Sequence, residues 1–205
     1  MAKYVMEFIG TFFLVLVAGL TGDALAIGAA LAVLVYMGGY ISGANYNPAV
    51  SFGLWIQKKL SNKDFLTYVG VQLVAGLAAA ATVGFLGDTD MVVKPGDGVS
   101  FWTAFAAEAV FTFALVSTVL HVAFTKKTKD NAYFGLAIGA VVLAGVVAVS
   151  GISGAALNPA VALGPNVLNW SLVNDWSMIW LYLFAPLVGG AVASLVWGWT
   201  QKNLK

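Results

Sequence analysis

The sequence predicts an all-α integral membrane protein with six transmembrane helices, two re-entrant half-helices and an inverted internal repeat. Of its 205 residues 60% are hydrophobic and only 9% are charged, which is more apolar surface than a soluble domain of this length can bury. Apolar runs long enough to cross a bilayer alternate with short polar connections. Two copies of a polar Asn-Pro-Ala segment interrupt this pattern.

The six predicted transmembrane helices are bounded by turn residues or lysines. They cover approximately residues 4–20, 24–41, 65–86, 101–123, 132–150 and 177–199. The first run follows Lys3 and has the charge pattern of a secretory leader, but Glu7 inside it favours a retained transmembrane helix. Only Thr21-Gly22-Asp23 separates the first two runs, so these helices are expected to be antiparallel neighbours.

Each Asn-Pro-Ala segment has the residues of a helix start. The first is Asn47-Pro48-Ala49 and the second is Asn158-Pro159-Ala160. Asn can cap a first turn, and Pro fits the first helical position because its missing N–H would have no partner there. The apolar stretches 49–56 and 160–168 reach only about 14 Å at ~1.5 Å per residue, roughly half of a ~30 Å hydrocarbon core. They are therefore predicted to be half-helices.

The two halves of the chain repeat each other. Besides the Asn-Pro-Ala segments, Glu7-Phe8-Ile9-Gly10-Thr11 matches Glu108-Ala109-Val110-Phe111-Thr112. The chain is therefore predicted to form a single membrane domain over 1–205, with internal repeats of about 1–86 and 101–200. Each repeat holds an odd number of crossings, so the second must be inverted, and its half-helix is expected to enter from the opposite face.

The lysines predict the orientation in the membrane. All ten basic residues are lysines, and nine fall on one predicted face: Lys3, Lys58, Lys59, Lys63, Lys126, Lys127, Lys129, Lys202 and Lys205. Lys94 falls on the other face, together with Asp23, Asp88, Asp90, Asp97 and Asp175. Since cytoplasmic loops carry an excess of Lys and Arg, both the N- and the C-terminus are predicted to be cytoplasmic.

Half-helices that enter from opposite faces would meet near the midplane and bring Asn47 and Asn158 side by side. The positive ends of their dipoles, each roughly half an elementary charge, would point at the same place and repel cations. Non-helical backbone at that depth is tolerated only where it is buried in protein or lines a water-filled cavity. The arrangement therefore predicts a pore that favours neutral molecules able to form hydrogen bonds.

The sequence lacks the residues of several other function classes. It has no cysteine and one histidine, so neither a metal site nor a cofactor is expected. It has no HExxH, GxSxG or phosphate-loop motif, so no enzymatic activity is expected. A net charge of +1 provides no basic field for nucleic acid. A secondary transporter shares the inverted-repeat plan and stays an alternative. Such a transporter would normally need a substrate or ion site with charged groups that return to their first state in each cycle, whereas the central asparagines offer only neutral amides.

Over essentially its whole length the chain resembles the aquaporin, or major intrinsic protein, family. The resemblance rests on the paired motifs and on Glu7, Glu108, Gln72 and Pro186, which agree with the family pattern. It implies the aquaporin fold and a homotetramer in the lipid bilayer, with a pore in each subunit for water and small neutral solutes. It also implies that Glu7 and Glu108 accept hydrogen bonds from the re-entrant loops. A proton-relay role for these carboxylates is the alternative.

One position departs from the family pattern. The second motif usually continues as Asn-Pro-Ala-Arg, and that arginine lines the narrowest, extracellular constriction, but this chain has Val161 there. By resemblance the other constriction positions are Ile27, Val146 and Ala155, so all four side chains of this selectivity filter are apolar. We therefore expect a wide, apolar outer mouth that passes water and also ammonia, hydrogen peroxide or glycerol-like polyols. The alternative is a water-only channel in which neighbouring groups narrow the ring.

Overall fold

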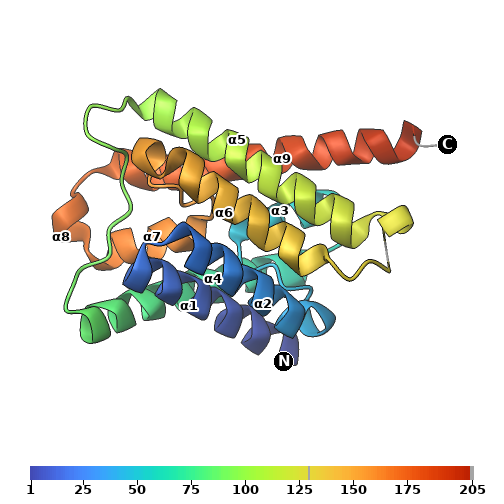
Figure 1. The fold of residues 1–205 in the computed structure, drawn as a ribbon, viewed down its shortest axis with the longest axis horizontal. Coiled ribbons are helices and arrows are strands. Elements are labelled where there is room, and N and C mark those ends of the chain that lie inside the picture. The colour runs from blue at the N-terminus through green and yellow to red at the C-terminus, as the bar shows by residue number, and fades with distance from the viewer. Residues whose placement is uncertain (129, 204–205) are drawn as a thin grey trace.

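The computed structural model describes residues 1–128 and 130–203 as a bundle of long helices that run roughly along one axis (Figure 1). Within these ranges six helices are long and apolar enough to cross a membrane. They are α1 (Ala2–Thr21), α2 (Ala24–Ser42), α4 (Asn62–Gly87), α5 (Phe101–Val119), α6 (Phe134–Ser153) and α9 (Trp176–Asn203). The predicted all-helical fold is therefore confirmed. The parts of the orientation prediction that concern Lys129 and Lys205 lie outside the described residues.

The helix ends differ from the predicted spans by a few residues, and local caps explain the differences. α4 begins at Asn62 because the Ser61 hydroxyl accepts the N–H of Asp64 at 3.1 Å. α6 continues to Ser153 and ends where Gly154 adopts a left-handed conformation with φ of 78°. α5 continues beyond Val119 as a π-helical turn, Leu120–Phe124. Two short elements were not predicted, the 3₁₀ turn Lys126–Thr128 and α8 (Trp170–Val173).

The two half-helices are α3 (Pro48–Ile56) and α7 (Pro159–Leu168), and each begins at its proline. In Figure 1 α7 lies on the left of the molecule and α3 to the right of it, so the two extend toward opposite ends of the bundle. Their N-terminal turns meet between the long helices. Both half-helices and their opposed entry are therefore as predicted.

Helices approach one another closely at small residues, which is the usual way for helices to pack in lipid. A Cβ on Gly190 of α9 would lie 2.8 Å from the carbonyl oxygen of Ala49 in α3. A Cβ on Gly76 of α4 would likewise overlap the carbonyl of Ala160 in α7, and one on Gly139 of α6 would overlap the backbone of α2. Gly76 and Gly139 therefore serve close helix packing. Each half-helix is seated against a long helix of the other repeat.

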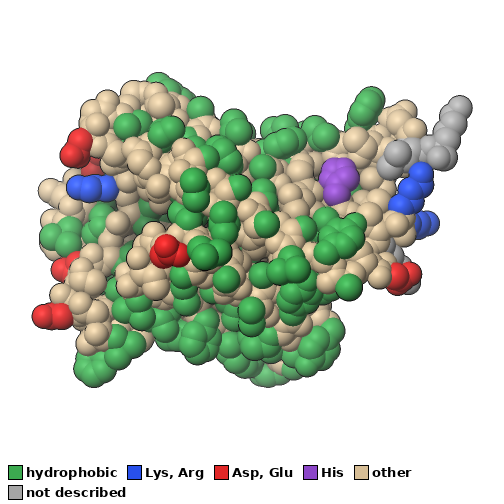
Figure 2. Space-filling model, viewed as in Figure 1, with side chains coloured by type: hydrophobic (Ala, Val, Ile, Leu, Met, Phe, Trp, Pro, Cys, Tyr) green, Lys and Arg blue, Asp and Glu red, His purple; other side chains and the backbone are tan. Residues whose placement is uncertain are grey.

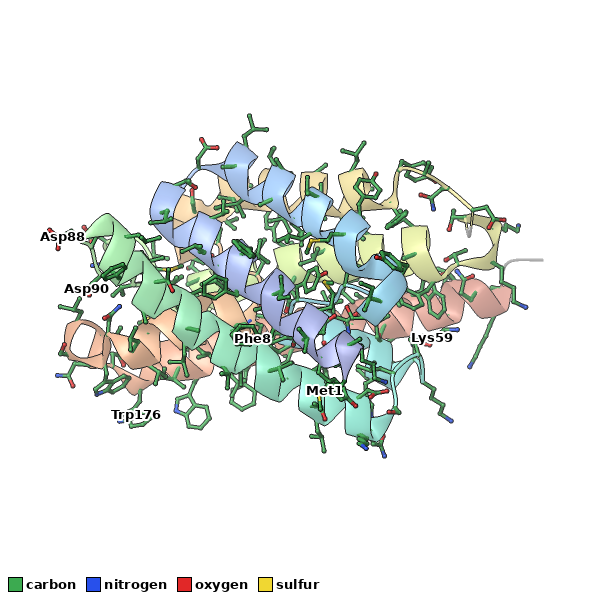
Figure 3. All side chains as sticks on the ribbon, turned by 90° about the horizontal axis from the view of Figure 1, so that it is seen from below. Met1, Phe8, Lys59, Asp88, Asp90 and Trp176 are labelled. Carbon is green, nitrogen blue, oxygen red and sulfur yellow. The ribbon has the colours of Figure 1, made fainter. Side chains whose placement is uncertain are left out.

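The two ends of the bundle differ in charge. The lysine-rich end carries Lys3, Lys58, Lys59, Lys63, Lys126, Lys127 and Lys202, and the acidic end carries Asp23, Asp88, Asp90, Asp97, Asp175 and Lys94. Basic side chains gather mainly at the right of Figure 2, and Figure 3 places Lys59 at the opposite end from Asp88 and Asp90. Between the ends, large hydrophobic side chains such as Val33, Leu136 and Val147 are exposed. This is the surface of a multi-pass integral membrane protein.

Candidate functional site

Asn47 and Asn158 face each other where the first turns of α3 and α7 meet. The side-chain amide of Asn47 donates a hydrogen bond of 2.9 Å to the carbonyl of Leu157. The amide of Asn158 donates one of 2.9 Å to the carbonyl of Tyr46. Each motif is therefore hydrogen-bonded to the loop of the other repeat, and the two amides lie side by side inside the bundle. Both side chains are almost completely buried.

Each Asn-Pro-Ala segment also caps its own half-helix. The asparagine oxygen accepts the N–H of the alanine two positions on, at 2.8 Å in Asn47-Pro48-Ala49 and 2.9 Å in Asn158-Pro159-Ala160. The proline between them occupies the first helical position, where its lack of an N–H costs nothing. Since an amide nitrogen carries two hydrogens and one is used across the interface, each asparagine keeps one free N–H.

The loops that lead into the half-helices contain non-glycine residues in the left-handed region. The φ values are 50° at Ala44, 52° at Tyr46, 49° at Ala155 and 50° at Leu157. Such residues cost about 1–3 kcal/mol each and persist only where the surroundings hold them. Their identical alternation in both loops turns two consecutive backbone N–H groups of each loop toward one buried carboxylate. The strain is therefore offset by a specific set of hydrogen bonds.

Glu7 holds the first loop. Its Oε1 accepts hydrogen bonds from the Ser42 hydroxyl at 2.7 Å and from the N–H of Asn45 at 2.9 Å. Its Oε2 accepts from the N–H of Tyr46 at 2.7 Å and from the Gln72 amide at 2.8 Å. The side chain is fully buried in α1. These four donors match the four lone-pair sites of a carboxylate.

Glu108 holds the second loop in the same way, from α5. Its Oε1 accepts from the Ser153 hydroxyl at 2.7 Å and from the N–H of Ala156 at 2.9 Å, and its Oε2 accepts from the N–H of Leu157 at 2.7 Å. It is also fully buried, but it has three donors, because the second repeat has Pro186 where the first has a glutamine.

A cavity of about 370 Å³ runs along the two asparagines. This is many times the ~15 Å³ that one water molecule needs. At the acidic end its wall includes Gly22, Thr89 and Asp90, and beyond the asparagines it extends to Val119 and Ile138 in the lysine-rich half. Away from the asparagines, aliphatic side chains supply most of the wall: Leu14, Ile27, Leu31, Val50, Leu115, Val119, Ile138, Val142, Val146 and Val161.

The four residues expected to form the outer constriction all line this cavity. They are Ile27, Val146, Ala155 and Val161. Ile27 lies in the first turn of α2 and Val146 in the C-terminal half of α6, so the ring lies between the asparagines and the acidic end. Its side chains offer no hydrogen-bonding group and no charge. The role of these residues as a selectivity filter stays a prediction.

The connection between α4 and α5 also takes part in the site, which no sequence pattern had predicted. The fully buried Asn166 of α7 donates to the carbonyl of Val93 and accepts its N–H, both at 2.8 Å. Asn169 donates to the carbonyl of Met91 at 2.9 Å. The connection therefore lies against α7 at the mouth of the cavity. An asparagine beside Pro165 inside an apolar half-helix was the one available signal.

Comparisons with known proteins agree with this geometry. The family model described as major intrinsic protein matches residues 16–197. The chain is 33% identical to aquaporin AqpM of Methanothermobacter thermautotrophicus, over 95% of each chain. It is 34% identical to glycerol uptake facilitator protein-like 6 of Lactiplantibacillus plantarum, again over 95% of each. The X-ray structure of the aquaglyceroporin from Plasmodium falciparum superposes with a TM-score of 0.82 at 25% identity, covering 95% of this chain and 93% of that one. The chain therefore belongs to the major intrinsic protein family of membrane channels, the family of the aquaporins.

Proposed function

We propose that the protein is a passive channel for water and small neutral solutes. The observation that carries this proposal is the pair of asparagine amides, fastened across the two half-helices, in a cavity whose other side chains are mainly aliphatic. A passing molecule loses part of its hydration in such a cavity. The free N–H groups of Asn47 and Asn158 replace that hydration at one point. A molecule with a lone pair, such as water, ammonia or a hydroxyl compound, can accept these hydrogen bonds.

The same centre disfavours ions. The N-termini of α3 and α7 point at the cavity, and each contributes a positive partial charge of roughly half an elementary charge. A cation is therefore repelled. An anion would lose most of its water between aliphatic walls and gain two N–H donors in return, which is too few to compensate. Neutral solutes pay neither penalty, so the channel is proposed to be selective for them.

The aliphatic ring of Ile27, Val146, Ala155 and Val161 is proposed to be the selectivity filter. Because none of these side chains is long or polar, the ring admits solutes larger than water and lets hydroxyl or amine groups slide past without binding. Ammonia, hydrogen peroxide and glycerol-like polyols are the solutes proposed besides water. The names of two similar proteins, a glycerol uptake facilitator and an aquaglyceroporin, support this choice. A water-only channel, with the ring narrowed by neighbouring backbone, is the alternative.

The proposed loop-supporting role of Glu7 and Glu108 follows from their donors, since each carboxylate accepts two consecutive N–H groups of a re-entrant loop. We further propose that the chain forms one channel domain with repeats of about 1–86 and 101–200, and that it assembles as a homotetramer whose exposed aliphatic side chains face lipid and the other subunits. The mass of the purified complex in detergent, measured by light scattering, tests the assembly.

A solute panel in proteoliposomes tests the function. Swelling or shrinkage is followed by stopped-flow light scattering with gradients of an impermeant osmolyte, glycerol and urea, and ammonia entry is followed with an internal pH dye. We expect water permeability above that of empty vesicles together with glycerol or ammonia uptake that does not saturate. Water movement alone would establish the water-only alternative. Saturable uptake coupled to an ion gradient would establish a secondary transporter.

A further inference from the structure

The segment from Met91 to Gly96, in the connection between α4 and α5, is fixed across one side of the cavity mouth. Asn169 binds the carbonyl of Met91, and Asn166 binds both the carbonyl and the N–H of Val93. Two residues past Lys94, the N–H of Gly96 donates to the carbonyl of Ile152 at 3.2 Å. The segment is therefore held to α7 before Lys94 and to α6 after it.

These attachments place Lys94 next to the predicted outer constriction. A Cβ on Gly154 would lie 2.9 Å from the carbonyl oxygen of Lys94 and 3.4 Å from its nitrogen, so the two backbones are in close contact. The next residue, Ala155, belongs to the apolar ring. Lys94 and all four ring residues line the same cavity. Its long, flexible side chain starts at a fixed point beside the ring.

Lys94 is also isolated in charge. Of the lysines that the structure describes it is the one that lies at the acidic end, among Asp23, Asp88, Asp90, Asp97 and Asp175, all of which are exposed. Asp90 lines the cavity mouth as well. In the part of the chain that the structure describes, no carboxylate lies within 4.0 Å of the Lys94 ammonium, whereas Lys3 pairs with Asp64 at 2.8 Å. The positive charge of Lys94 is therefore not cancelled by a bound partner.

We propose that Lys94 is the specificity-determining cation of the outer mouth, excluding small cations such as potassium, ammonium and hydronium from a filter that has no charged side chain. The acidic end by itself would concentrate cations at the mouth. A cleft lined by charge of one sign changes the local concentration of an ion by about 10–1000-fold and leaves neutral solutes unaffected. Lys94 is exposed and shares the mouth with Asp90, so its single charge acts at the low end of this range. The inference rests on the proposed channel function and adds a residue to the predicted apolar ring.

The test replaces the charge and measures cations and water separately. Lys94→Gln, Lys94→Glu and Lys94→Arg are reconstituted in proteoliposomes with Lys127→Glu as the matched control, because Lys127 is an exposed lysine of the lysine-rich end. We expect water permeability to stay within about twofold in all four variants. Leak of potassium and protons, followed with internal dyes, should rise about tenfold in Lys94→Glu and less in Lys94→Gln. It should stay at the wild-type level in Lys94→Arg and in the control.

A second measurement avoids comparing separately folded variants. The chain has no cysteine, so Lys94→Cys carries the sole thiol, and the folded channel can be modified with an aminoethyl or a sulfonatoethyl methanethiosulfonate. The positive reagent should lower the cation leak and the negative reagent should raise it. Equal leak after both reagents, or an equal rise in Lys127→Glu and Lys94→Glu, would overturn the inference. Wild-type vesicles that conduct no water would instead overturn the proposed function.

Discussion

Glu7 accepts four hydrogen bonds and Glu108 accepts three, although the two residues occupy matching places in the two repeats. The difference comes from Gln72, which donates to Glu7, whereas its counterpart Pro186 has no donor to give. A carboxylate can accept all of these hydrogen bonds because both of its oxygens are acceptors. An amide has one accepting oxygen and would leave two donors of the first site, but one of the second, without an acceptor.

We therefore predict that Glu7→Gln destabilises the protein about twice as much as Glu108→Gln. A buried donor left without a partner costs about 1–3 kcal/mol, so Glu7→Gln should cost about 2–6 kcal/mol and Glu108→Gln about 1–3 kcal/mol. The measurement is unfolding of purified protein by a denaturing detergent. Water permeability per folded channel should change little. Normal stability with altered proton flux would support the proton-relay role instead.

The proposed role of Val161 in the selectivity filter can be tested by substitution. It lines the cavity in a half-buried position, so a longer side chain there can extend into open space. We predict that Val161→Arg lowers glycerol and ammonia uptake about tenfold, which corresponds to ~1.4 kcal/mol of added barrier, while water still passes. Val161→Leu adds bulk without charge or hydrogen-bond donors and should have a smaller effect. An unchanged solute profile in Val161→Arg would contradict the filter assignment.

At the scale of elements, Tyr46 links the first re-entrant loop to the helices around it. Its ring is fully buried, and its hydroxyl donates to the carbonyl of Leu34 in α2 at 3.0 Å. A Cβ on Gly38 of α2 would overlap that hydroxyl, and a Cβ on Gly10 of α1 would overlap the ring. Because the two glycines have no side chains, the Tyr46 ring and hydroxyl fit against α1 and α2, and these contacts hold the re-entrant loop in place. The carbonyl of Tyr46 in turn holds the amide of Asn158.

We predict that Gly38→Ala destabilises the protein by about 1–3 kcal/mol and lowers water permeability, because the overpacked tyrosine displaces the loop. Gly70→Ala in α4 is the control, since nothing lies within 4 Å of its added methyl group and alanine favours the helix by about 0.5–1 kcal/mol. Thermal unfolding in detergent and stopped-flow shrinkage provide the readouts. Tyr46→Phe removes the overlapping hydroxyl, so the double variant should recover part of the loss. Additive effects of the two changes would count against this explanation.

The six long helices and the two half-helices followed from the sequence, whereas the short elements did not and the details of the site followed only in part. Asn followed by Pro, at 47 and at 158, provides an N-cap and a first helical residue, so the half-helices were readable from local chemistry. The contact of Tyr46 with Gly10 and the hydrogen bonds between Asn166 and Val93 join residues distant in the chain, and no local pattern encodes them. The π-helical turn after Val119 continues an apolar run that has no turn or breaker residue, so no sequence signal marks it.

At the scale of the whole molecule, the separation of charge between the two ends predicts how the channel sits in a membrane. The lysine-rich end carries Lys58, Lys59, Lys126 and Lys127, and the acidic end has Lys94 as its lysine among several aspartates. Positively charged loops stay on the cytoplasmic side during insertion. Both the start of α1 and the end of α9 belong to the lysine-rich end. The orientation therefore stays a prediction that rests on charge.

Because the chain has no cysteine, single introduced cysteines can test this orientation in the membrane. Asp97→Cys lies on the exposed connection of the acidic end, and Lys127→Cys lies on the exposed turn of the lysine-rich end. In intact cells a membrane-impermeant maleimide should label the first variant and leave the second unlabelled until the cells are permeabilised. The reverse pattern would place the lysine-rich end outside, and labelling of both at once would indicate mixed insertion.

Each half-helix packs against a long helix of the other repeat, and this arrangement has a consequence for biosynthesis. α3 is seated by Gly190 of α9, which is made long after it, and α7 is seated by Gly76 of α4, which is made long before it. The earlier half-helix must therefore wait until α9 has been made, whereas the later one emerges after the helix that seats it. Assembly of the pore accordingly cannot finish before α9 is present, and a nascent chain stalled before α9 lacks the helix that seats its first half-helix.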